Sequence, residues 1–348
     1  MHSTTVAVDL AKNVFELAVT DCKGEIGERL RLNRARFAAF FVQRPPCRVL
    51  MEACGSAHYW ARRISAHGHR VELLPAQYVR RYVRRSKTDR ADAAALIEAA
   101  RCTEIRAVPV KTLEQQQVLG LHRLRAQWMS TRHRYLNTLR GLLREFGVAI
   151  PQGAHIGRAQ IARQLRQPSQ ELPAALRPLL SEMLADLDQL EQRVEQVERE
   201  LASITRADPI VQRLREIPGI GPLTRTALRA SVGDIGRFPC ARRFASWLGL
   251  TPREYSSGER RRLGSISKQG DVYVRTLLVH GARAALLAAH RLQRTGHPPD
   301  RLRLWALKCQ RQRGHNIATV ALANRLARIV WATWKHERRF DGNWAVTA

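Results

Sequence analysis

The chain has 348 residues, enough for roughly two or three domains. Its 59 Lys and Arg residues outnumber its 30 Asp and Glu residues, which gives a formal net charge of +29. An excess this large opposes self-association and favours a polyanionic partner, because basic side chains that bind phosphates release counterions. Because the charge extends along nearly the whole chain, we expect nucleic acid as the partner.

The cysteines exclude two other classes of protein. There are six of them, at positions 22, 47, 54, 102, 240 and 309, and no two form a C-x-x-C pair. This scatter argues against a zinc site and a disulfide framework, and is typical of a reducing compartment. The N-terminus does not read as a signal peptide, and no apolar window reaches the ~18–20 residues that a membrane span requires. We therefore expect a soluble cytoplasmic protein, associated with the nucleoid and not with a membrane.

Residues 1–108 read as an α/β domain. Alternating apolar residues and flanking turn residues predict strands at Thr4–Leu10, Val14–Thr20, Ile26–Asn33, Arg48–Ala53 and Arg70–Pro75, with helices at Arg34–Gln43 and His58–His67 and a last helix from about Thr88 to Arg101. This element order is that of the ribonuclease-H-like fold, to which RuvC belongs. In that layout the first and fourth strands are neighbours.

Four carboxylates lie at strand ends or at a helix start in this element order. Asp9 ends the first apolar run and Glu52 ends the fourth, so we expect them to meet near one edge of the sheet. Asp89 and Asp92 are three residues apart at the start of the last helix, where their side chains share a face. Like charges placed this way repel each other unless a cation neutralises them. Hard oxygen ligands favour Mg²⁺ or Mn²⁺, so the four acids predict a divalent-metal site.

Residues 109–206 read as a helical arm. Its second half alternates apolar steps of four and three, the heptad pattern of a coiled coil. The seam consists of Leu176, Leu180, Met183, Leu187, Leu190, Val194, Val197, Leu201 and Ile204. This helix could pair with the first half of the arm within one chain, or with another chain and so form a dimer or tetramer. Arginines along the first half, Arg132 and Arg140 among them, favour a nucleic-acid contact there.

Residues 207–348 are expected to be mostly helical. Gly219 and Gly221, in Ile217–Pro222, leave backbone N–H groups free before a helix, which resembles the helix-hairpin-helix clamp on a nucleic-acid backbone. A polar loop follows at 251–270, rich in serine, glycine and arginine. Its arginines could steady a phosphate next to a serine nucleophile. No histidine base stands beside these serines, so residue chemistry alone selects no nucleophile.

Taken together, the motifs resemble the DEDD transposases of the insertion-sequence-110 family, which are related to the pilin-gene invertases. The matching segments are V-D-L-A-K at Asp9, M-E-A-C-G-S at Glu52, K-T-D-R-A-D-A at Asp89 and Asp92, I-P-G-I-G, and L-G-L-T-P-R-E-Y-S-S-G. The resemblance implies a metal-binding tetrad of Asp9, Glu52, Asp89 and Asp92, with Ser257 as the nucleophile. It also implies donor and target DNA as substrates and guidance by a structured noncoding RNA.

We therefore expect a three-domain recombinase, with domains at 1–108, 109–206 and 207–348, that assembles through its coiled-coil arm. The nucleic-acid contacts expected are Lys87, Arg90, Arg132, Arg140, Gly219, Gly221, Arg260, Arg261, Arg262 and Lys268. Two alternatives stay open. One is a ribonuclease-H-like, junction-resolving nuclease that uses water and never the serine. The other is a nucleic-acid-binding protein whose carboxylates are relics.

Overall fold

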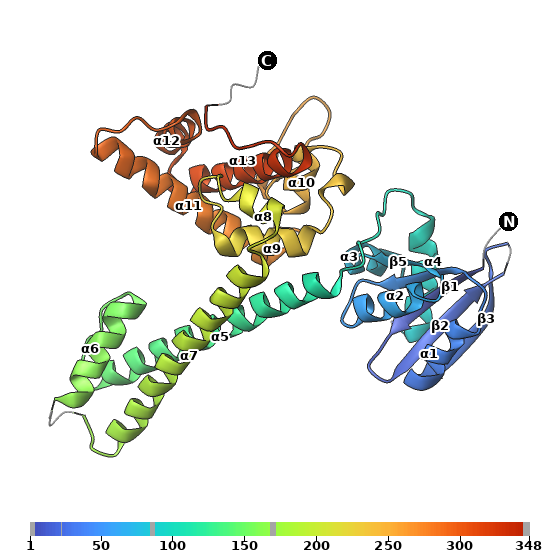
Figure 1. The fold of residues 1–348 in the computed structure, drawn as a ribbon, viewed down its shortest axis with the longest axis horizontal. Helices are drawn as coiled ribbons and strands as arrows, with labels where there is room; N and C mark the ends of the chain where they lie inside the picture. Colours follow the sequence, from blue (N-terminus) through green and yellow to red (C-terminus); the bar gives the residue numbers. More distant parts are fainter. Residues whose placement is uncertain (1–3, 22, 84–87, 168–171, 344–348) are drawn as a thin grey trace. The chain divides into compact units, whose positions relative to one another are not determined.

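A computed structural model describes residues 4–21, 23–83, 88–167 and 172–343. The chain divides into two compact units, Met1–Thr112 and Leu113–Ala348, shown in Figure 1. The first unit is built on a sheet and the second is mostly helical. The three-domain division, with the arm separate from the C-terminal helices, stays a prediction.

The first unit contains a five-stranded sheet. Its strands are β1 Thr5–Leu10, β2 Val14–Thr20, β3 Ile26–Asn33, β4 Arg48–Glu52 and β5 Arg70–Leu74, in the order β3-β2-β1-β4-β5. The first three form an antiparallel meander, whereas β1, β4 and β5 are parallel. The first and fourth strands are therefore neighbours, which confirms the expectation from the element order.

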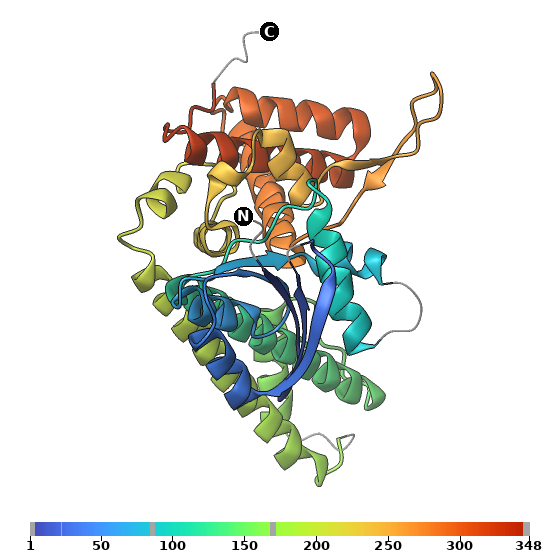
Figure 2. The same cartoon turned by 90° about the vertical axis from the view of Figure 1, so that its right-hand side faces the viewer.

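Helices cover both faces of this sheet (Figure 2). On one face, α1 (Arg34–Val42) and α2 (Ala57–Ser65) pack aromatic side chains such as Phe37 and Trp60 against Val6 and Val8. On the other face, α4 (Asp89–Arg101) packs against Ala7, Ala18 and Leu50 through small and aliphatic side chains. A short connection, α3 (Ala76–Val79) and the 3₁₀ turn η1 (Arg80–Tyr82), follows β5.

The second unit begins with a helical arm made of α5 (Leu113–Glu145), α6 (Ala154–Arg166) and α7 (Leu176–Ile204). Helices α5 and α7 are antiparallel, since Arg125 Nε lies 2.7 Å from Glu198 Oε1 and Arg132 Nη1 lies 3.5 Å from Glu191 Oε1. The heptad seam of α7 is buried at Leu180, Leu187, Leu190, Val194, Val197 and Leu201. Of the two pairings that the heptads allowed, the structure therefore has the one within a single chain.

The remaining helices form the largest core. They are α8 (Pro209–Leu214), α9 (Pro222–Val232), η2 (Ile235–Arg237), α10 (Ala241–Trp247), α11 (Val272–Arg294), α12 (Arg301–Arg313) and α13 (His315–Lys335). The base of the arm is joined to this core by buried His122 of α5. Its two ring nitrogens each lie 3.0 Å from a hydroxyl, that of Thr226 in α9 and that of Tyr273 in α11. Helix α11 is long and apolar enough to cross a membrane, but Leu278, Ala282 and Leu286 are buried in this core.

A two-stranded hairpin extends from the helices of the second unit, as Figure 2 shows. It consists of β6 (Pro252–Glu254) and β7 (Leu263–Ile266). Buried Arg275 fastens its base by donating hydrogen bonds from Nη1 to the carbonyl oxygens of Leu248 (3.0 Å) and Gln269 (2.8 Å). Gly270, at φ +80°, lets the backbone pass so close to Trp247 that a Cβ would lie 1.9 Å from the Trp247 carbonyl oxygen. The hairpin is thus held firmly at its base.

Candidate active site

Asp9 and Glu52 lie side by side at the ends of neighbouring parallel strands. The last register pair between β1 and β4 joins Val8 to Met51, and Asp9 and Glu52 are the next residues along each strand. Both carboxylates act on Cys54: burial raises the pKa of the Cys54 thiol, and the negative charges of Glu52 and then Asp9 raise it further. The two acids therefore share one neighbourhood, as their strand positions predict.

These acids lie on the face of the sheet that α4 covers. Side chains alternate between the two faces of a strand, so Asp9 is on the face of Ala7 and Glu52 is on the face of Leu50. Ala7 and Leu50 both belong to the cluster that packs against α4. The carboxylates consequently point to the layer that holds the helix acids.

Helix α4 begins over this end of the sheet. Its N-cap is Thr88, whose hydroxyl accepts a hydrogen bond from the Ala91 N–H at 3.2 Å. Near its start, the Arg90 carbonyl accepts a hydrogen bond from Arg29 of β3. At its other end, Arg101 donates to the Gly24 carbonyl at 2.8 Å, in the turn remote from Asp9. The helix direction therefore brings its first turn, with Asp92, toward the ends of β1 and β4.

The acids near this edge are of the ligand class that a hard divalent cation takes, but the described residues do not bring enough of them together to form a complete site. Asp9, Glu52 and Asp92 are all half-buried carboxylates, the ligand class that Mg²⁺ and Mn²⁺ take. Across the described part of the chain, no three His, Cys, Asp or Glu residues form a group that could hold a metal ion. Position 89 opens α4 one turn before Ala93, but the Asp89 side chain lies outside the described residues. The structure thus brings two of the four acids together and directs the helix of the others toward them.

Glu16 is a fifth acid at this edge that the sequence analysis missed. It is the register partner of Asp9 across β1 and β2, it lies on the same face as Ala18, and only 8% of it is exposed. Arg90 Nε lies 3.5 Å from its Oε1. The alternation within Val14–Thr20 carried the signal, because it makes Glu16 an acid on a buried face.

The serine loop forms the tip of the β6–β7 hairpin. Ser257 and Arg260 form an isolated antiparallel bridge around a two-residue turn, with Gly258 at φ +55°. The neighbouring Ser256 is engaged, since its hydroxyl donates to Glu254 Oε1 at 2.8 Å and accepts from the Arg262 N–H at 3.1 Å. Within the described residues the Ser257 hydroxyl has no hydrogen-bond partner, and the residue is exposed. The two adjacent serines therefore differ in availability.

Two sequence models match the chain. One, described as Transposase and covering DEDD transposases of the IS110 type, matches residues 6–148. The other, described as Transposase IS116/IS110/IS902 family, matches residues 211–297. A probable family 20 transposase of Pseudomonas aeruginosa is 42% identical over 338 residues, which cover 97% of this chain and 98% of that protein. The chain belongs to the IS110 family of transposases.

Two further relatives of this transposase come from named insertion sequences. The transposase for IS1111A of Coxiella burnetii is 37% identical and covers 94% of this chain and 88% of its own length. The transposase for IS1328 of Yersinia enterocolitica is 37% identical and covers 94% and 96%. The protein is thus a DNA transposase of an insertion sequence, and DEDD transposases normally use a divalent metal ion.

The nucleic-acid contacts expected of the transposase have varied surroundings. Lys87 lies outside the described residues. In the arm, Arg132 is paired with Glu191, and Arg140 Nη2 donates to the carbonyl oxygens of Pro151 (3.0 Å) and Gly153 (2.8 Å). On the hairpin, Arg260, Arg261, Arg262 and Lys268 are all exposed. The hairpin residues therefore have the freer guanidinium and ammonium groups, although Arg261 lies 3.4 Å from Glu254.

The two glycines of the Ile217–Pro222 motif do different things. A Cβ on Gly219, at φ +82°, would lie 2.4 Å from the Gly281 carbonyl oxygen in α11, so this glycine permits close packing. Gly221 is the N-cap of α9 and has open space where a Cβ would stand.

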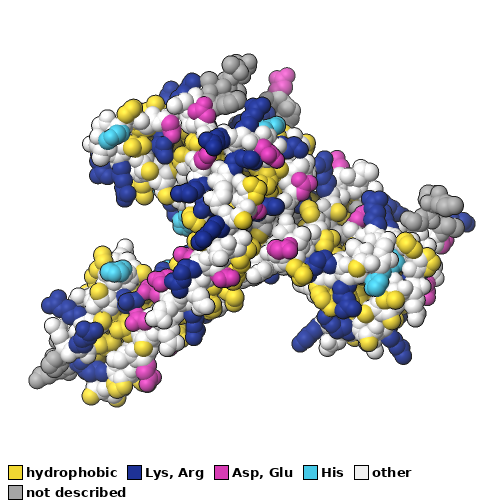
Figure 3. Space-filling model, in the orientation of Figure 1, with side chains coloured by type: hydrophobic (Ala, Val, Ile, Leu, Met, Phe, Trp, Pro, Cys, Tyr) yellow, Lys and Arg dark blue, Asp and Glu magenta, His cyan; other side chains and the backbone are white. Residues whose placement is uncertain are grey.

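Lys and Arg side chains are spread over the visible surfaces of both units of the transposase rather than gathered in one patch (Figure 3).

Proposed function

We propose that this transposase cuts and rejoins DNA with divalent ions, Mg²⁺ or Mn²⁺, held by Asp9, Glu52, Asp89 and Asp92, and with Ser257 as the nucleophile. The observation that carries the proposal is the register of β1 and β4, which sets Asp9 beside Glu52 on the face that α4 covers. The β-strand order and the helices on both faces agree with a ribonuclease-H-like domain, in which acids at these strand ends do this work.

The bound ions would supply charge neutralisation for the phosphate and acidify an attacking oxygen. The protein residues would do the rest. Ser257 Oγ attacks the scissile phosphorus, the Oγ–P bond forms, and the P–O bond to the departing nucleotide breaks. The serine proton passes to solvent water as the Oγ–P bond forms, and the departing oxygen takes up a proton from solvent. Arg260 and Arg262 flank the attacked phosphate and offset its negative charge.

The choice of Ser257 over Ser256 is supported by the hairpin itself. Ser256 is held between Glu254 and the Arg262 backbone, so its hydroxyl already donates and accepts hydrogen bonds. Ser257 stands exposed next to a glycine turn, with Arg260 as its bridge partner. A hydroxyl with no intramolecular partner can approach a phosphate without first losing a hydrogen bond.

The proposal includes a structured guide RNA as the partner that selects donor and target DNA, on the basis of the family resemblance. A net charge of +29 is compatible with an RNA and two DNA segments bound at once. It also includes a homo-oligomer, a dimer or tetramer, that acts on DNA in the cytoplasm. Because the heptad seam of α7 is buried against α5, the oligomer would use other surfaces of the arm.

The test is the capture of a covalent protein–DNA adduct. Wild-type protein, with its co-purifying RNA, is incubated with DNA carrying the element ends and Mg²⁺, then denatured and resolved by mass. An adduct at Ser257 is expected in the wild type and in Ser256→Ala, and its absence is expected in Ser257→Ala and Asp9→Asn. Undiminished recombination by Ser257→Ala would instead support the water-using nuclease. If the wild type and all variants bound DNA without metal and none cleaved it, the protein would instead be a nucleic-acid-binding protein whose carboxylates are relics.

A further inference from the structure

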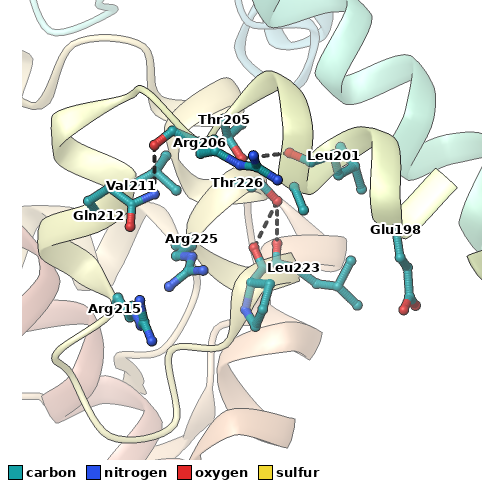
Figure 4. A pocket seen from close by; sticks show the side chains of 12 residues that line it. Glu198, Leu201, Thr205, Arg206, Val211, Gln212, Arg215, Leu223, Arg225 and Thr226 are labelled. Atoms are coloured by element: carbon teal, nitrogen blue, oxygen red, sulfur yellow. Dashed lines mark hydrogen bonds between the residues drawn. The ribbon is translucent and has the colours of Figure 1, made fainter.

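A pocket in the second unit is lined by three arginines from separate segments. It lies among the end of α7, α8 and the start of α9, with a volume of about 390 Å³ (Figure 4). Arg206 follows α7, Arg215 caps the C-terminus of α8, and Arg225 lies in the first turns of α9. Arg206 and Arg215 are exposed at the opening, whereas Arg225 is half-buried inside.

Among the described residues, no acid forms an ion pair with any of these three guanidinium groups. Of the described residues that line the pocket, Glu198 alone is acidic, and its Oε1 is 2.7 Å from Arg125 Nε of α5. Arg225 Nε is buried and has no hydrogen-bond partner in the described structure. Burial, and then the positive charge of Arg215, lower the pKa of Arg225. Unpaired like charges in a shared pocket are unfavourable, so this arrangement calls for an anion.

The other polar groups of the pocket are already engaged. Thr226 Oγ1 donates to the carbonyl oxygens of Pro222 and Leu223, and Thr205 Oγ1 donates to Leu201 at 2.6 Å (Figure 4). Gln212 Nε2 donates to the Arg206 carbonyl at 2.9 Å. The main side-chain donors left for a ligand are therefore the guanidinium N–H groups. The start of α9 lines the pocket too, and its Gly221 cap offers no side-chain hydrogen bond, so the positive end of the helix dipole adds to the attraction.

We infer that the pocket of Arg206, Arg215 and Arg225 binds a backbone phosphate of nucleic acid. Planar guanidinium groups match phosphate oxygens with paired hydrogen bonds, and a cavity of this size admits a phosphate with part of the sugars beside it. The inference depends on the proposed function for one point only, namely that the polyanion is nucleic acid. It assigns a phosphate contact to the α7–α8–α9 junction, whose lining includes neither the four acids nor any residue of the serine hairpin.

The experiment measures binding without divalent ions, in EDTA, so that neither the acids nor Ser257 can act. Fluorescence anisotropy follows three probes of equal length: duplex DNA, single-stranded DNA and an RNA hairpin. Arg225→Met keeps the aliphatic bulk and removes the charge. Arg199→Met is the matched control, because it removes the same charge from an exposed position on α7.

For Arg225→Met we expect about tenfold weaker binding of at least one probe. The slope of log affinity against log salt concentration should also become smaller by about one, which corresponds to the loss of one phosphate contact. The probe that loses affinity identifies DNA or RNA as the source of the phosphate. We also expect an unchanged or higher Tm, since the variant removes a desolvated charge that has no partner. Inorganic phosphate should raise the Tm of the wild type more than that of the variant. Arg215→Met, at the open rim, should reproduce the binding defect and covers the case in which Arg225→Met fails to fold.

The inference would be overturned if both pocket variants bound all three probes with the affinity and salt dependence of Arg199→Met. The pocket would then be assigned to a carboxylate of another protein. A lower Tm with unchanged binding would likewise overturn it, because the arginine would then be structural. Wild-type protein that binds through the pocket but never cleaves DNA would refute the proposed function alone, so the two failures are distinguishable.

Discussion

Arg90 Nε lies 3.5 Å from the Glu16 carboxylate, and Glu16 is the register partner of Asp9. This contact links the first turn of α4 to the strand next to the one that carries the first acid. Because α4 contributes two of the proposed metal ligands, the contact bears on how accurately they are placed. Ligand sets of this kind depend on the groups that orient them.

Glu16→Gln should weaken the site while leaving the fold intact. The amide keeps the shape of the side chain but removes the charge that attracts Arg90, so we expect Mg²⁺-dependent cleavage to fall on the order of tenfold. Glu98→Gln is the control, because Glu98 lies on α4 like Arg90 but is paired with Arg101. This variant should cleave at the wild-type rate. Equal rates for both variants in a plasmid-nicking assay would show that Glu16 has no part in the site.

Gly270→Ala should destabilise the base of the serine hairpin. The new Cβ would lie 1.9 Å from the Trp247 carbonyl oxygen at φ +80°, so a loss of at least about 3 kcal/mol in the free energy of unfolding is expected. Gly258→Ala is the matched comparison at the hairpin tip, with φ +55° and open space around it, and should cost only about 1–2 kcal/mol. Urea denaturation measures both, and a larger loss at Gly258 would contradict this account.

His122 should make the stability of the second unit depend on pH. Burial, and then the charge of Arg125, lower the pKa of His122 to about 4 from an ordinary value of 6.5. The unfolded chain therefore binds a proton that the folded chain does not between pH 6.5 and 4. The free energy of unfolding should fall by up to about 3 kcal/mol as the pH drops through that window.

His122→Gln tests this dependence, because glutamine does not titrate. Its unfolding free energy, measured by urea denaturation at intervals from pH 7 to 4, should decline less steeply than that of the wild type. His133→Gln, on the exposed side of the same helix, should retain the wild-type slope. A wild-type slope in His122→Gln would mean that other groups carry the dependence.

Much of the first unit could be predicted from local pattern. Val14–Thr20 and Ile26–Asn33 are strands with the predicted bounds, because turn residues flank them. The last helix was expected to start at about Thr88, and Thr88 is the N-cap of α4. The pairing of the first and fourth strands followed from element order. Glu16 was missed because its role depends on which strand lies opposite, and a register is a property of the folded sheet.

The second unit shows where pattern is insufficient. The heptads of α7 predicted an apolar seam but could not specify what covers it, and the answer is α5 of the same chain. Strands β6 and β7 are short and mostly exposed, so no alternation marked them. The phosphate contact expected of Gly219 stays a prediction, but the pattern gave no sign that a Cβ at this position would lie 2.4 Å from the Gly281 carbonyl oxygen in α11. Arg206 and Arg225 are far apart in sequence, and only the packing of three helices brings them to one pocket.

The carboxylates at the ends of β1 and β4, together with those of α4, are proposed to hold divalent ions. Mn²⁺ binding, followed by electron paramagnetic resonance of the free ion, tests this proposal in the wild type, Asp9→Asn, Glu52→Gln and the control Glu98→Gln. We expect the wild type and Glu98→Gln to bind Mn²⁺ alike, whereas Asp9→Asn and Glu52→Gln should each lose at least one bound ion or bind about tenfold more weakly. Identical Mn²⁺ binding by all four proteins would contradict it.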